Sequence, residues 1–220
     1  MRRGLFVTGT DTGVGKTVVS AALLRRYGRE APLRYWKPIQ TGAPPDDDTA
    51  EVRRLAAGSG AEVVDGGVRL PDPVSPHLAA ARAGETIDLE PLVARPAGGV
   101  DAGWVVEGAG GLLVPINRFA LMADLIGRLE LAAVVVARST LGTINHTLLT
   151  LEALRARSLA VAGVVMVGDP DRDNREAITR YGRVDVLGEL PRLDPLSAGA
   201  LDGWVRGGLD PGGRLRRWLA

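Results

Sequence analysis

The stretch GTDTGVGKT, residues 9–17, decides the fold of this 220-residue chain. It resembles a phosphate-binding loop, whose pattern is a glycine, four free positions and then Gly-Lys-Ser/Thr. Counting back from Gly15 puts the first glycine of that pattern at position 10, which is Thr10, while the glycine stands one place earlier at Gly9. The stretch is therefore either a phosphate loop with one extra residue or a glycine-rich structural turn.

The surroundings of the stretch favour the phosphate loop. The apolar run at residues 5–9 (LFVTG) predicts a buried strand before it, and a helical pattern runs from Lys16 to Tyr27 after it. In that context the backbone N–H groups of residues 13–17 can point at phosphate oxygens, helped by the helix N-terminus. Lys16 would neutralise the β- and γ-phosphates, and the Thr17 hydroxyl would bind Mg²⁺. A threonine-capped structural turn would not require Gly-Lys-Thr at this place.

Composition places the chain among ordinary globular proteins. Hydrophobic residues make up 45% and charged residues 24%, which predicts one domain over residues 1–220. The net charge of +1 gives no case for a nucleic-acid or membrane partner, and the longest apolar run, residues 131–137, is far short of the ~20 residues that cross a bilayer. The lack of cysteine excludes disulfides and a cysteine nucleophile. With too short an apolar run near its start for a signal peptide, the chain is expected to be cytoplasmic.

Short apolar runs alternate with helical patterns, which predicts an α/β, single-domain P-loop NTPase-like fold: a mostly parallel central sheet with helices on both faces. The expected strands are residues 5–9, 33–39, 104–108, 132–137, 162–168 and 184–191. The expected helices are residues 16–27, 49–57, 77–83, 89–94 and 143–156, with two short helical pieces in the tail, broken by GGLDPGG (207–213). Because ligands bind beyond the carboxyl ends of such strands, residues 10–17, 37–41 and 107–111 should converge.

Two charged residues stand at the ends of predicted strands. Glu107 occupies the place at which phosphate-loop proteins keep an acidic metal partner, usually aspartate, and the glycines after it leave room for a ligand. The alternative is a charged strand end followed by a flexible turn. Lys37, next to Pro38, is expected to face the same crevice, where a second cation could stabilise a transferring phosphoryl group. An ordinary surface lysine is the alternative there.

Two predicted helix starts carry further candidates. Asp46–Asp48 (DDD) precede a helix, and the attraction of carboxylates to the helix dipole would explain them without any function. The functional alternative is that Asp48 supplies Mg²⁺ with a second carboxylate. Gly142, Thr143 and Asn145 open another helix, so free backbone N–H groups there could hold a carboxylate.

Taken together, these segments resemble the dethiobiotin synthetase family. The resemblance covers residues 5–193 and follows this order: FVTGTDTGVGKT, KPIQTG, an acidic run before a helix, SPH, VEGAGGLLVP, LGTINHTLLT and LGELP. A loop with one extra residue is the form that this family uses. The resemblance implies an ATP- and Mg²⁺-dependent ligase of biotin biosynthesis, which makes dethiobiotin, ADP and phosphate from 7,8-diaminopelargonic acid, CO₂ and ATP. A carbamate would form first, the γ-phosphoryl group would convert it to a carbamic–phosphoric anhydride, and the second amine would close the ring.

The resemblance also implies roles for individual residues. Catalysis would involve Lys37, Lys16 and Thr12, and Mg²⁺ would be held by Thr17, Asp48 and Glu107. The nucleotide would be bound by Gly13, Val14, Gly15, Lys16, Thr17, Val18, Asp48, Glu107, Gly108, Ala109, Gly110, Pro191, Arg192 and Leu193. The substrate would be bound by Thr41 and, at its carboxylate, by Gly142, Thr143 and Asn145 reached across a dimer interface. A homodimer is therefore implied, with each site completed by the partner.

The sequence departs from the family at one place. It leaves one main competing interpretation, besides the synthetase half of a cobyrinic-acid amidating enzyme, which needs an added glutaminase domain, and a nonenzymatic nucleotide-binding module, which leaves Lys37 and two carboxylates unexplained. Some members carry Asn-Asp after the strand at residues 162–168, and that asparagine reads adenine; the aligned residues here are Val167 and Gly168. Base recognition would then rest on backbone groups around residues 191–193, and other nucleoside triphosphates are alternatives to ATP. The competing interpretation is a regulatory or partitioning ATPase with the same class of loop. Those proteins carry a lysine about where Asp11 stands, which argues against it.

Overall fold

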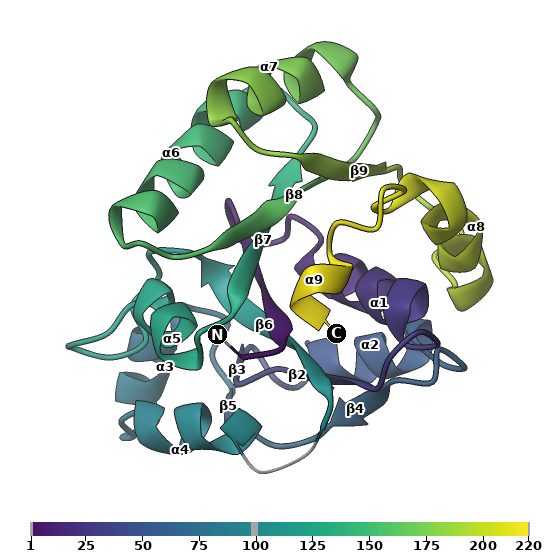
Figure 1. Cartoon of the computed structure of the whole chain (residues 1–220). Coiled ribbons are helices and arrows are strands. Elements are labelled where there is room, and N and C mark those ends of the chain that lie inside the picture. Colours follow the sequence, from purple (N-terminus) through teal and green to yellow (C-terminus); the bar gives the residue numbers. More distant parts are fainter. Residues whose placement is uncertain (1, 98–100, 220) are drawn as a thin grey trace.

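The computed structural model describes residues 2–97 and 101–219, and a seven-stranded sheet lies at its centre (Figure 1). The strand order is β4-β2-β6-β1-β7-β8-β9, and all neighbouring pairs run parallel. The strands of this sheet are β1 (Gly4–Gly9), β2 (Leu33–Trp36), β4 (Glu62–Val64), β6 (Gly103–Gly111), β7 (Ala132–Arg138), β8 (Val161–Val167) and β9 (Val186–Leu190). A separate pair, β3 (Ile39–Thr41) and β5 (Val68–Leu70), forms a small parallel sheet.

Helices cover both faces of the central sheet, as the alternating pattern predicts. One face packs against α1 (Lys16–Tyr27), α2 (Asp48–Leu55), α8 (Ala198–Gly208) and α9 (Arg216–Leu219). The other packs against α3 (Pro76–Arg82), α4 (Leu89–Ala94), α5 (Met122–Leu129), α6 (Thr143–Ala156) and α7 (Arg172–Gly182), and a short 3₁₀ helix, Arg95–Ala97, follows α4. Along residues 2–97 and 101–219, no helix is long and apolar enough to cross a membrane.

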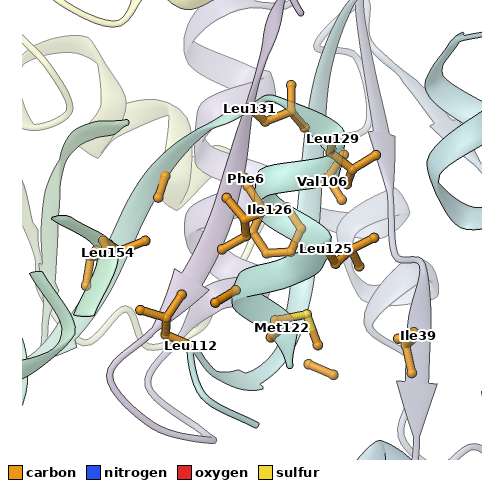
Figure 2. Packing of buried hydrophobic residues seen from close by; sticks show 14 of the residues in the cluster. Phe6, Ile39, Val106, Leu112, Met122, Leu125, Ile126, Leu129, Leu131 and Leu154 are labelled. Carbon is orange, nitrogen blue, oxygen red and sulfur yellow. The ribbon is translucent and has the colours of Figure 1, made fainter. Parts of the chain in front are cut away.

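Side chains of the central strands divide between the two faces because successive residues of a strand point in opposite directions. Leu5 and Val7 of β1 belong to the apolar cluster around α1, whereas Phe6 between them belongs to the cluster on the opposite face. Figure 2 shows Phe6 close to Ile126 of α5. Both apolar clusters are buried between the sheet and the helices that pack on it. The carboxyl ends of the strands therefore extend from a packed core.

The structure corrects three expectations about the strands. The strand expected at residues 33–39 ends at Trp36, since Pro38 has no N–H to continue the ladder, and Ile39 begins β3 in the small sheet. The strand expected at residues 104–108 continues to Gly111, which pairs with Gly9. The short strands β3, β4 and β5 were not expected at all.

The C-terminal segment is tied to the far end of α1. Asp210 is fully buried, and its carboxylate accepts hydrogen bonds from the Tyr27 hydroxyl at 2.5 Å and from the backbone N–H groups of Arg214 and Leu215 at 2.9 and 2.7 Å. Burial and the bond to Asp210 raise the pKa of the Tyr27 phenol. The glycine-rich tail therefore has a structural role: it completes the covering of the α1 face.

Replacing Tyr27 with phenylalanine should lower the free energy of unfolding by about 1–3 kcal/mol, because a buried carboxylate loses one of its donors. Urea denaturation at pH 7 measures this difference. A raised phenol pKa stabilises the fold fully below the unfolded-state value of ~10 and less above it. The difference between the two proteins should therefore shrink at alkaline pH. Tyr181→Phe, at an exposed tyrosine of α7, is the control and should leave stability unchanged.

Candidate active site

The loop between β1 and α1 explains why its first glycine stands at position 9. A Cβ atom at Gly9 would lie 2.7 Å from the Asp11 carbonyl oxygen and 2.8 Å from the Val14 side chain. The chain therefore folds back over Gly9, and only a residue without a side chain fits beneath it. The extra residue lengthens the arch of chain between Gly9 and Gly15 and does not shift the start of the helix. α1 still begins at Lys16, directly after Gly15, whose φ is 98°.

Lys16 lies back across this arch. Its Nζ donates a hydrogen bond to the Asp11 carbonyl oxygen at 3.0 Å, and the side chain is almost fully buried. Burial, together with the positive charge of Lys37, lowers the pKa of Lys16 to about 8. A phosphate anion brought to this ammonium would favour the charged form again. The side chain is therefore placed to exchange a backbone oxygen for a phosphate oxygen.

Lys37 lies between two carboxylates just beyond the end of β2. Its Nζ forms ion pairs with Asp48 Oδ2 at 2.6 Å and Glu107 Oε1 at 2.9 Å, and it donates a hydrogen bond to the Gly108 carbonyl oxygen at 3.0 Å. An ammonium group has three N–H donors, and three oxygens surround this one. The buried Lys37 ammonium and the buried Glu107 carboxylate thus neutralise each other where three chain segments meet.

The pKa values in this cluster follow from the ion pairs. Burial by itself would lower the pKa of Lys37, but the carboxylates of Glu107 and Asp48 outweigh it and raise the pKa. Burial likewise opposes ionisation of Asp48, and the charge of Lys37 more than compensates, so the pKa of Asp48 is lowered. Lys37 and Asp48 are therefore both held in their charged forms at neutral pH.

The oxygen atoms beside this cluster suit a magnesium ion. Thr17 Oγ1 lies 2.8 Å from Asp48 Oδ1 and 3.1 Å from Glu107 Oε1, so a hydroxyl and two carboxylates meet at one point. In the part of the chain that the structure describes, no cluster of three or more His, Cys, Asp or Glu side chains could hold a metal alone. Mg²⁺ typically binds one or two carboxylates and completes its shell with phosphate and water, so this oxygen set fits Mg²⁺ bound together with a nucleotide.

These residues line one cleft with a volume of about 1000 Å³ at the carboxyl ends of the strands. It brings together all three segments expected to converge, which confirms that prediction. From the predicted site it contains Thr12, Gly13, Gly15, Lys16, Thr17, Val18, Lys37, Thr41, Asp48, Glu107, Ala109 and Gly110. Val14 instead packs into the core behind the loop, and Gly108 presents its carbonyl oxygen to Lys37.

Two groups of predicted residues lie outside the lining of this cleft. Gly142, Thr143 and Asn145 form the start of α6, where Gly142 precedes the helix and the Thr143 hydroxyl donates to the Arg138 carbonyl oxygen. Residues 191–193 follow the outermost strand β9. Val167, which ends β8, lies against Gly15: a Cβ atom added to that glycine would be 3.1 Å from the valine side chain.

Three polar residues beside the site were missed from the sequence. The Tyr35 hydroxyl donates to Glu107 Oε2 at 3.0 Å, the Gln40 side chain accepts from the Asp48 backbone N–H at 3.4 Å, and Arg138 forms an ion pair with Asp11 at 2.6 Å. Tyr35 and Gln40 lie within three residues of Lys37, but the roles of all three residues depend on contacts between segments that are distant in the sequence.

Both lysines of the chain line this cleft. Lys16 and Lys37 are the two lysines in the sequence, and every other long cationic side chain is arginine. A lysine ammonium is a compact charge with three donors, whereas an arginine presents a planar fork. The three oxygens around Lys37 match the first geometry.

A phosphate loop opening α1, a hydroxyl with two carboxylates beside it and a parallel sheet below define a P-loop nucleotide-binding protein of the α/β class. Residues 3–200 match the AAA domain family. The ATP-dependent dethiobiotin synthetase BioD of Paramagnetospirillum magneticum is 52% identical over 201 residues, which is 91% of this chain and 94% of that protein. BioD of Agrobacterium fabrum is 47% identical over 196 residues, 89% of each. The chain belongs to the dethiobiotin synthetase family.

Solved structures agree on the fold. The septum site-determining protein MinD from Pyrococcus horikoshii, complexed with Mg-ADP, aligns with a TM-score of 0.60 over 98% of this chain and 93% of that one, at 16% identity. At this level of identity the likeness shows a shared P-loop fold and nothing about partners or regulation. It therefore lends no weight to the regulatory or partitioning ATPase interpretation.

Proposed function

We propose that this protein catalyses the ATP-dependent carboxylation and ring closure of 7,8-diaminopelargonic acid to dethiobiotin, the activity that its family name describes. The observation that carries the proposal is the position of Lys37 in the same cleft as the phosphate loop. A phosphate loop alone accounts for nucleotide binding. A second buried cation in the same cleft is what a carbamate and a transferring phosphoryl group would require.

Both nucleophiles of this reaction belong to the substrate. The protein has to position the reactants and stabilise the charge that develops on them. One substrate amine adds to CO₂ and loses a proton, giving a carbamate that Lys37 and Thr41 would hold. A carbamate oxygen then attacks the γ-phosphorus and ADP leaves, while Lys16 and Thr12 stabilise charge on the phosphoryl oxygens. The second amine attacks the carbamate carbon, expels phosphate and closes the ring.

The magnesium ion belongs to this proposal as well. Thr17, Asp48 and Glu107 would hold it, and it would neutralise charge on the β- and γ-phosphates. The nucleotide would lie along Gly13–Val18, with Gly108–Gly110 on one side and residues 191–193 near the base. The cytoplasmic location stays a prediction from the composition.

The test is release of nucleoside diphosphate with Mg²⁺, bicarbonate, ATP and the diamine, omitting each component in turn and checking the product mass. Turnover that needs both the diamine and bicarbonate, with dethiobiotin as product, is expected. Repeating the series with CTP ranks the nucleotides, which matters because Val167 has no side-chain amide with which to read a base. Hydrolysis indifferent to the diamine would overturn the proposal and favour a regulatory ATPase.

We also propose a homodimer formed through the start of α6. Leu141, which directly precedes the start of α6, and Leu149 within α6 are exposed by 103% and 56%. Asn145 lies four residues before Leu149 in α6, so these two side chains share one face of the helix. Exposed apolar side chains gathered in this way are typical of an interface. In a dimer, Gly142, Thr143 and Asn145 at the start of α6 would reach the partner's cleft and hold the substrate carboxylate.

A double variant, Leu141→Asp with Leu149→Asp, should convert the dimer to a monomer of 23.1 kDa, because two carboxylates would face each other across the interface. Light scattering after size-exclusion chromatography measures the mass. The KM for the diamine should rise in parallel. Leu78→Asp, at an exposed leucine of α3, is the control and should stay dimeric. A wild-type protein that is already monomeric at micromolar concentration would contradict the proposal.

A further inference from the structure

Tyr35 is a buried tyrosine next to the proposed magnesium site that the reaction itself does not use. It lies on β2 and pairs with Val105 of β6, so Glu107, two residues further along β6, projects from the same face of the sheet. The Tyr35 hydroxyl donates to Glu107 Oε2 at 3.0 Å, and both residues are fully buried. The tyrosine thus contacts the carboxylate from the side that faces the core.

The two oxygens of Glu107 have separate partners. Oε1 lies near the Lys37 ammonium at 2.9 Å and the Thr17 hydroxyl at 3.1 Å, whereas Oε2 accepts from Tyr35. A buried carboxylate oxygen without a donor is costly, so the hydroxyl both satisfies Oε2 and fixes the rotation of the carboxylate. Only one oxygen of Glu107 is then left to serve the cleft.

Apart from Glu107, the strand residues around Tyr35 on this face of the sheet are apolar. Its neighbours on the same face include Leu33 of β2, Val105 of β6 and Val7 of β1, all of them buried in one cluster. A phenylalanine would fill this space without bringing a polar atom into it. The hydroxyl is therefore explained by its acceptor and not by packing.

We propose that Tyr35 is a positioning residue for magnesium: its hydroxyl holds Glu107 with Oε1 directed at the cation, without contacting cation, nucleotide or substrate itself. This inference rests on the proposed magnesium site. Partners that orient a metal ligand from behind typically contribute about 10- to 100-fold in metal affinity or activity.

The chain contains a matched control for this proposal. Tyr27 is also a buried tyrosine that donates to a buried carboxylate, Asp210, but in the C-terminal segment. Tyr35→Phe and Tyr27→Phe therefore make the same chemical change in the same kind of environment. Both should lower stability, and only Tyr35→Phe should alter the response to magnesium.

The experiment is calorimetric titration of each full-length protein with ADP, first in EDTA and then over a series of Mg²⁺ concentrations. In Tyr35→Phe, the Mg²⁺ concentration that gives half of the tightening of ADP binding should rise about 10-fold. Its ADP affinity in EDTA should be that of the wild type, and Tyr27→Phe should match the wild type throughout. An equal Mg²⁺ response in the two variants would overturn the inference. A wild-type ADP affinity indifferent to Mg²⁺ would instead overturn the proposed magnesium site.

A second measurement does not depend on the folding of Tyr35→Phe. The chain has three tyrosines, so ¹³Cζ-tyrosine labelling gives three signals, assigned through Tyr27→Phe and Tyr181→Phe. Adding Mg²⁺ to the ADP-bound wild-type protein should shift the Tyr35 signal and leave the other two in place. No shift at Tyr35, in a protein whose ADP binding does respond to Mg²⁺, would overturn the inference.

Discussion

Replacing Lys37 with alanine is expected to lower kcat by about 10³-fold, more than any other single substitution in the cleft. The ammonium is the one buried cation outside the phosphate loop in the described cleft, and in the proposed mechanism it would stabilise the carbamate and the transferring phosphoryl group. Without it, Asp48 and Glu107 would also repel each other and the incoming phosphate. Steady-state rates of dethiobiotin formation measure the loss.

Two further variants separate this effect from simple destabilisation. Lys37→Arg keeps the positive charge but replaces three converging donors with a planar fork, so it should recover only a small part of the activity. Arg34→Ala, on the strand β2 that directly precedes Lys37 and paired with Glu62 outside the cleft, should retain the wild-type rate. A Lys37→Ala protein with more than a tenth of the wild-type kcat would remove this residue from the mechanism.

Glu107→Gln is expected to reduce kcat/KM by about 10²-fold and to raise the Mg²⁺ concentration needed for activity. The carboxylate receives a donor on each oxygen, from Lys37 and from Tyr35. An amide in its place must turn its NH₂ group toward one of these donors and also withdraws a negative charge from the proposed cation site. Activity measured against Mg²⁺ concentration gives both effects.

Asp210→Asn is the control for this prediction. Asp210 is as completely buried as Glu107 and also accepts a tyrosine hydroxyl, so its amide variant should be destabilised to a similar degree. Its Mg²⁺ requirement should nevertheless stay unchanged. If both variants require more Mg²⁺ in equal measure, the effect of Glu107→Gln comes from stability and not from the cation.

The sequence predicted the parts of the fold that local pattern controls. The long apolar runs indicated β1, β7 and β8, and α1 and α6 begin and end where expected, because periodicity and glycine or proline signals are local. The strands β3, β4 and β5 have three residues each, too few to show a period, and their pairing joins segments far apart in sequence. The apolar pattern therefore predicted six of the seven strands of the central sheet, β9 at one edge included, and missed β4 at the other edge and the separate pair β3 and β5.

In the candidate site too, residues that belong to a local motif were predicted, and residues whose role depends on distant segments were not. Gly15, Lys16 and Thr17 follow from a motif with fixed spacing, and Glu107 from its place near the end of the apolar run at residues 104–108. The role of Tyr35 needed the register between β2 and β6, which nothing in either strand alone specifies. The docking of Asp210 against Tyr27 likewise joins residues 183 positions apart and could not be read from a pattern.

The presence of both lysines in one cleft has a practical consequence for anyone who handles the protein. Reagents that acylate primary amines, such as succinimidyl esters used for dyes, crosslinkers and surface coupling, find no lysine elsewhere in the chain. Of the two, Lys16 has the pKa of about 8 and so the larger share of free amine in mildly alkaline buffer. Acylation of either lysine would therefore compete directly with nucleotide, and fluorescent derivatives are better made through an introduced cysteine, since the chain contains none of its own.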